Sequence, residues 1–166
     1  MKKIWMLLLL PLCFGFMACG NDEESENTSP AGDISEEQLI GLWEMTYIKG
    51  WYYDEDNDDN VVKRTIDMEV KPETLNKFYE HDISDYVRYQ FLSGKKFKNY
   101  TYIVESGTWK EGKIVDYKIE GRTIILAPGR GTEEQVTVIN NPSKELVLHN
   151  YDPEEFDLTI TLKKIN

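Results

Sequence analysis

Alternation of hydrophobic and polar residues is the dominant pattern of the chain from residue 42 onward. It is cleanest near the end, where one face of a predicted strand carries Phe156, Leu158, Ile160 and Leu162. An early strand at 42–53 is predicted to place on one face Trp43, Met45, Tyr47, Trp51 and Tyr53, and on the other Glu44, Thr46 and Tyr52. Further strands are predicted at 61–70, 86–92, 96–105, 107–118, 123–127, 135–139 and 144–150.

Short turns separate these segments. Turn dipeptides occur at Gly94-Lys95, Gly121-Arg122, Pro128-Gly129 and Asn141-Pro142, and Glu111-Gly112 marks a break within 107–118. A meander of this kind leaves two exposed edges unless the sheet closes on itself. The pattern therefore predicts a mostly β protein, a single up-and-down antiparallel β-barrel of about eight or nine strands.

Two short helices interrupt the strand pattern. Ser35-Glu36-Glu37-Gln38 has the form of a capping box, and the helix that it opens is expected to stop at Gly41. A second helix is predicted from Pro72 to His81, with Leu75, Phe78 and Tyr79 on its apolar face. Such a helix either covers the open end of a barrel or packs against one side of its core.

The start of the chain has the form of a secretory signal. Lys2 and Lys3 precede an apolar run, residues 4–16, that is shorter than the roughly 20 residues of a membrane span. Of the two cysteines, Cys19 follows the small residue Ala18, whereas Cys13 follows the bulky Leu12. The sequence therefore predicts a cleaved signal at 1–18 and a mature chain with one cysteine and no internal disulfide.

The tetrapeptide Phe16-Met17-Ala18-Cys19 resembles the lipobox of bacterial lipoproteins. The resemblance implies that Cys19 becomes an acylated N-terminus, with chains such as palmitate holding the protein on a membrane. Residues 19–33 have the composition of a disordered acidic tether, and 34–166 form one domain. An acidic run after such a cysteine resembles a surface-export signal, so outer-membrane surface display is expected, with the periplasmic face as the alternative.

Charge narrows the choice of partners. The 166 residues carry a net charge of −11, and loss of the leader lysines makes the mature chain more acidic. Such a surface disfavours nucleic acid and anionic headgroups. The domain is large enough for one core, and a monomer is expected.

Gly41 and Trp43, after a short helix and at the start of a long strand, resemble the lipocalin G-x-W signature. The segments 92–126, 144–150 and 158–165 are similar to lipocalin-like domains of small bacterial surface lipoproteins. The resemblance covers about 34–166 and implies that Trp43 plugs the closed end of a barrel, with Lys163 or Lys164 over it. It also implies an apolar ligand, with candidate wall residues Tyr47, Tyr89, Phe91, Tyr100 and Tyr102. The apolar face of the predicted 72–81 helix, with Leu75, Phe78 and Tyr79, is expected to lie at the mouth where the ligand enters.

The sequence gives only weak evidence for a catalytic or metal site. Asp54 to Asn60 has alternating carboxylates, but Asp59 and Thr65 replace the glycine and glutamate of a calcium loop. His81 and His149 are the only histidines, too few for zinc. No serine lies in a nucleophile elbow. The sequence predicts no metal, no cofactor and no enzyme activity.

Two functions remain open. The first is a lipid-anchored, non-enzymatic module that binds a small apolar or amphipathic ligand within the barrel. The alternative is an interaction protein with a filled barrel, whose Trp51 to Asn60 edge meets a surface glycan or a partner protein.

Overall fold

The computed structural model describes residues 32–55, 61–81, 85–129 and 133–165. The signal, Cys19, nearly all of the tether and most of the Asp54–Asn60 loop lie outside these residues. The helical elements are α1 (Glu36–Leu39), η1 (Pro72–Thr74) and α2 (Leu75–Tyr79). The strands are β1 (Gly41–Glu55), β2 (Val61–Glu69), β3 (Val87–Leu92), β4 (Lys96–Ile103), β5 (Thr108–Glu111), β6 (Val115–Glu120), β7 (Thr123–Leu126), β8 (Glu134–Val138), β9 (Glu145–Asp152) and β10 (Phe156–Ile165).

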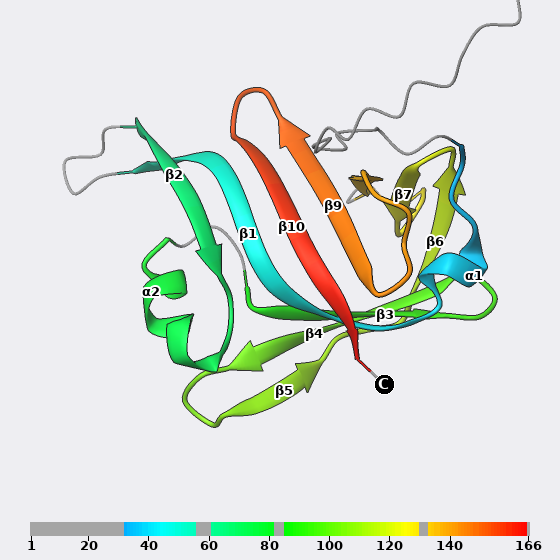
Figure 1. Ribbon diagram of the computed structural model, residues 1–166, viewed down its shortest axis with the longest axis horizontal. Helices are drawn as coiled ribbons and strands as arrows, with labels where there is room; N and C mark the ends of the chain where they lie inside the picture. The colour runs from blue at the N-terminus through cyan, green and yellow to red at the C-terminus, as the bar shows by residue number, and fades with distance from the viewer. Residues whose placement is uncertain (1–31, 56–60, 82–84, 130–132, 166) are drawn as a thin grey trace, which may run out of the picture.

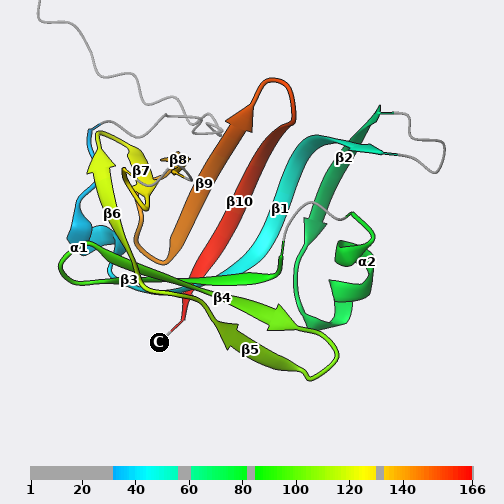
Figure 2. The same cartoon turned by 180° about the vertical axis from the view of Figure 1, so that it is seen from behind.

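Eight antiparallel strands close into a barrel (Figure 1, Figure 2). The order around it is β1-β3-β4-β6-β7-β8-β9-β10, and β10 pairs again with β1 from Leu42 to Tyr52. The predicted mostly β fold, with one barrel and two short helices, is confirmed. Closure removes the free edges that a meander would otherwise expose.

The remaining two strands, β2 and β5, widen the barrel at the end far from α1. β1 pairs with β3 only over residues 41–44, and its second half, from Tyr47, pairs with β2 instead. Similarly, β4 pairs with β6 through Lys96 and Phe97 and then with β5. Figure 1 shows α2 beside β2 and close to the β4–β5 pair. The two halves of the sheet diverge there, and α2 packs between them through the buried Leu75 and Phe78.

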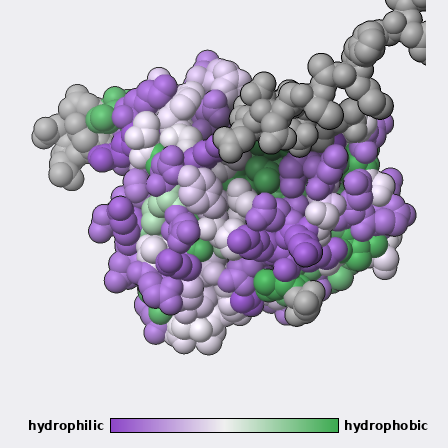
Figure 3. Space-filling model, viewed as in Figure 1, coloured by the Kyte–Doolittle hydropathy of each residue, from purple (hydrophilic) through white to green (hydrophobic). Residues whose placement is uncertain are grey.

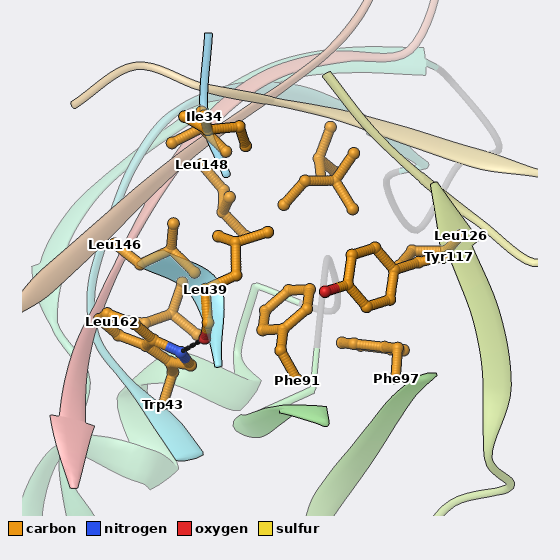
Figure 4. Close-up of a cluster of buried hydrophobic side chains, with 13 residues drawn as sticks. Ile34, Leu39, Trp43, Phe91, Phe97, Tyr117, Leu126, Leu146, Leu148 and Leu162 are labelled. Carbon is orange, nitrogen blue, oxygen red and sulfur yellow. Dashed lines mark hydrogen bonds between the residues drawn. The ribbon is translucent and has the colours of Figure 1, made fainter. Parts of the chain in front are cut away.

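Two hydrophobic clusters form the core. The first lies at the α1 end and is built around Leu39, Trp43, Phe91, Tyr117 and Leu162 (Figure 4). The second lies at the α2 end and includes Met45, Ile48, Tyr52, Ile66, Leu75, Phe78 and Leu158. Tyr89 and Ile160 contact both clusters, so the core is continuous along the barrel.

A β-bulge in β1 overturns part of the predicted face assignment. The register with β10 shifts between Met45 and Tyr47, so that Met45 pairs with Leu162 and Tyr47 with the next residue, Thr161. An extra residue reverses the face of every side chain after it. Ile48 and Tyr52 are therefore buried, while Tyr53 is 42% exposed. The prediction that Tyr47, Trp51 and Tyr53 share the face of Trp43 is wrong.

Candidate functional site

The residues of the G-x-W signature lie together at the α1 end. Trp43 is fully buried, and its indole Nε1–H donates a 2.7 Å hydrogen bond to the carbonyl oxygen of Leu39 (Figure 4). Lys164 Nζ lies 5.0 Å from the centroid of the Trp43 ring. Gly41 has φ +142, and a Cβ there would lie 2.4 Å from Lys164 Cε, so glycine leaves room for the lysine stem.

Of the two lysines proposed to cover Trp43, the structure selects Lys164. Lys163 is exposed on the other side of β10, where its Nζ lies 3.9 Å from Glu145 Oε1. Side chains alternate along a strand, so Lys164, although exposed, lies on the same side of β10 as the buried Leu162. Lys163 is therefore not the residue that contacts the signature tryptophan.

The eight residues proposed to bind a ligand do not line one pocket. Leu75, Phe78 and Phe91 are buried in the two core clusters. Tyr47 lies on the outer face, where its hydroxyl donates to Asp67. The Tyr100 hydroxyl donates to Gln90 Oε1 at 2.8 Å.

Tyr79 and Tyr102, by contrast, meet in a surface groove between α2 and the end of β4. The groove has a volume of about 470 Å³ and is lined by Asn76, Tyr79, Glu80, Asp85, Thr101, Tyr102, Ile103, Val104 and Glu105. The Tyr79 hydroxyl donates to the Tyr102 carbonyl oxygen, and it accepts from the Tyr86 backbone N–H, both at 3.4 Å. These bonds join the helix to β4 and to Tyr86, the residue before β3.

The groove combines an apolar wall with negative charge. Tyr79 and Tyr102 are partly buried, and Val104 is 43% exposed at the rim. Burial raises the pKa of the Tyr79 hydroxyl, and the carboxylates of Asp85 and Glu105 raise it further. The phenol is therefore neutral at physiological pH, a hydrogen-bonding group beside three acidic side chains.

A rigid aromatic cluster lies behind this groove, and the sequence did not predict it. The Tyr102 ring centroid is 5.2 Å from that of Trp109 and 5.6 Å from that of Tyr86. Arg88 stacks over Trp109 at 4.0 Å. Its guanidinium also bonds Glu44 through Nε at 2.8 Å and Nη2 at 2.7 Å.

The Tyr86 hydroxyl completes this cluster by donating to Glu44. Burial, and then that hydrogen bond, raise the Tyr86 pKa far above its usual value. The sequence carries no local sign of the cluster, because Glu44 and Arg88 become neighbours only through the β1–β3 register.

The two histidines have separate partners. His81 Nδ1 lies 2.9 Å from the Tyr52 hydroxyl, and His149 Nε2 lies 2.9 Å from Asp157 Oδ1. Within the described ranges, no three His, Cys, Asp or Glu side chains gather in a group that could hold a metal. Asp54, the one described acid of the proposed calcium loop with a placed side chain, pairs with Arg64 at 2.6 Å.

None of the helices in the described part of the chain has the length and apolar character needed to cross a bilayer. Comparison with protein-family models, with curated proteins and with solved structures gives no match to this chain. The barrel is of the kind found in lipocalins, and the fold is compatible with a binding module.

Proposed function

We propose that the protein is a non-enzymatic binding module, anchored to the outer membrane through acylated Cys19, that holds a small amphipathic molecule in the groove beside α2. The observation that carries the proposal is the meeting of Tyr79 and Tyr102 in one groove with Ile103 and Val104. Concave sites with an apolar wall and a few polar groups are the usual form of small-molecule sites.

The charge of the groove selects among amphipathic ligands. Glu80, Asp85 and Glu105 surround the apolar wall, so a cationic head group is attracted and a carboxylate is repelled. The preferred ligand is therefore an apolar body with an amine, rather than a fatty acid. Leu75 and Phe78 of α2 take no direct part, because they are used in the core, whereas Tyr79 lines the groove.

Binding of paired probes tests this site. A fragment of residues 32–166 keeps the bond from Arg122 Nη1 to the Gly32 carbonyl oxygen, at 2.8 Å, and both core clusters. We expect it to bind a dansyl-labelled alkylamine about tenfold more tightly than a dansyl-labelled fatty acid of equal chain length. Fluorescence titration at low ionic strength measures both affinities.

Val104→Arg is designed to disrupt binding in the groove, because it places a bulky cation at an exposed position on the rim. We expect this variant to lose about tenfold in affinity for the amine probe. Ile114→Arg, at a position 56% exposed outside the groove, is the control and binds as wild type does. If the two variants bind the amine probe equally well, or if the protein prefers the fatty acid, the groove is not the binding site proposed here.

Intact-mass measurement of the protein extracted from its own membranes tests the anchor independently. The expected species begins at Cys19 and carries acyl chains, together with any molecule that co-purifies in the groove. An unmodified cysteine at the mature N-terminus would rule out lipid anchoring while leaving the groove proposal intact.

A further inference from the structure

The outer face of β2, β1, β10 and β9 carries aromatic side chains that the barrel core does not use. The strand register defines three consecutive rows across this face, Glu69–Tyr47–Thr161–Val147, Asp67–Lys49–Thr159–His149 and Thr65–Trp51–Asp157–Tyr151. Beyond them, Tyr53 packs edge-on against Trp51, with ring centroids 5.4 Å apart. The bulge in β1 places Tyr47, Trp51 and Tyr53 on this outer face.

Two grooves lie end to end along these rows. One, of about 420 Å³, includes Tyr47, Glu69 and Thr161, and the other, of about 470 Å³, includes Lys49, Trp51, Thr65, Asp67, Asp157 and Thr159. Alternate residues of a strand are about 6.7 Å apart, so both grooves together extend over several repeats of a chain molecule. This geometry suits an extended ligand better than a compact one.

Trp51 is the centre of the second groove. Its ring is half-buried, and Lys63 Nζ lies 3.9 Å from the ring centroid. Thr65 and Thr159 both donate and accept hydrogen bonds, whereas Asp67 and Asp157 accept them. A flat aromatic surface surrounded by such groups complements a sugar ring, which has apolar C–H faces and hydroxyls around its edge.

The charges on this face nearly cancel, unlike those of the whole chain. Among the placed side chains of these strands, those on this face include three lysines, Lys49, Lys63 and Lys163, and five carboxylates, Glu44, Asp67, Glu69, Glu145 and Asp157, of which Glu44 is paired with Arg88 of β3. Figure 3, seen from the side on which β1, β10 and β9 lie in front, shows pale areas of intermediate hydropathy among purple ones. Such a face offers little net charge to attract or orient an ionic partner.

We propose that the outer face of β2, β1, β10 and β9 binds a linear, uncharged polysaccharide, with Trp51 as the main stacking residue. Tyr47, Tyr53 and Tyr151 extend the stacking surface along and across the sheet. The hydroxyls and carboxylates between them bond the sugar hydroxyls. This site is separate from the groove beside α2, which lies at the end of β4, so the two proposals stand or fall independently.

Affinity electrophoresis of the full chain tests the proposal. Native gels with a polyoxyethylene detergent contain hydroxyethyl cellulose, xyloglucan, soluble mannan or no polysaccharide. At least one neutral polysaccharide is expected to retard the protein. Trp51→Ala should weaken that interaction about tenfold or more, while Trp51→Phe retains most of it.

Two further variants separate binding from folding. Tyr53→Ala changes a 42% exposed side chain on the face and should weaken retardation without unfolding the barrel. Tyr100→Ala, on β4 and away from the face, is the matched control and should leave retardation unchanged. The proposal is overturned if no neutral polysaccharide retards the chain, if Trp51→Ala migrates as wild type does, or if only a charged polysaccharide, a protein or a second copy binds this face.

Discussion

Trp43 and Trp51 lie on the same strand, β1, yet they belong to two different regions of the molecule. Trp43 is fully buried at the α1 end, hydrogen-bonded to Leu39 and packed in the first cluster. Trp51 lies on the outer face, in contact with Lys63 and Tyr53. The bulge between Met45 and Tyr47 separates the two environments. One strand therefore serves the core with its first half and a solvent-facing surface with aromatic residues of its second half.

The largest expected effect comes from replacing the two tryptophans and comparing the stability of the two variants. Trp43→Ala is expected to lower the free energy of unfolding by about 3–5 kcal/mol, because it empties a large buried volume. Trp51→Ala is expected to cost about 1 kcal/mol, as for an average substitution. Urea melts of the two variants measure both changes. A Trp43→Ala effect below about 1 kcal/mol, or equal effects, would contradict the assignment of the two residues to different regions.

Tyr117 lies in the first cluster, at the α1 end of the barrel. It is 2% exposed, its hydroxyl has no hydrogen-bond partner, and burial raises its pKa to about 12. Between about pH 10 and 12 the unfolded chain loses this proton while the folded barrel keeps it. Tyr117 alone therefore lowers the free energy of unfolding by about 1.4 kcal/mol per pH unit in this range, and its contribution is fully present below pH 10.

Tyr117→Phe should remove that part of the pH dependence. At neutral pH the variant should be as stable as wild type or more so by about 1 kcal/mol, since an unsatisfied buried hydroxyl is lost. Tyr151→Phe replaces a phenol that is 56% exposed and serves as the control. Urea melts at pH 7, 10 and 11 give the comparison. An unchanged alkaline slope in Tyr117→Phe would show that this phenol is not protected by the core.

Much of this fold follows from the sequence because alternation and turn residues are local signals. The β10 alternation predicts Leu158 and Leu162 as core residues, and both are buried. The break predicted at Glu111-Gly112 is the end of β5. The same phase along β10 points to Lys164, so the choice between the two lysines was available from the sequence.

The bulge in β1 and the candidate sites could not be predicted from local sequence signals. Nothing in the sequence between Met45 and Tyr47 indicates a β-bulge. Strict alternation through this point therefore assigned Tyr47, Trp51 and Tyr53 to the wrong face of the strand. The groove beside α2 needs Tyr79 and Tyr102 to meet, which depends on how the helix fills the divergent sheet. Such contacts between distant segments are set by tertiary packing, and local periodicity does not contain them.

The smallest expected effect concerns the two lysines near the end of β10. Lys164→Gln removes a cation from the Trp43 ring and should cost about 0.5–1 kcal/mol of unfolding free energy. Lys163→Gln removes only a surface contact with Glu145 and should cost about 0–0.5 kcal/mol. Both changes put the same neutral, polar side chain in place of a lysine, so the difference between their urea midpoints compares the contact with the tryptophan with the surface contact. A larger loss in Lys163→Gln than in Lys164→Gln would contradict the contact between Lys164 and Trp43, because it would assign the stabilising cation to the outer side of the strand.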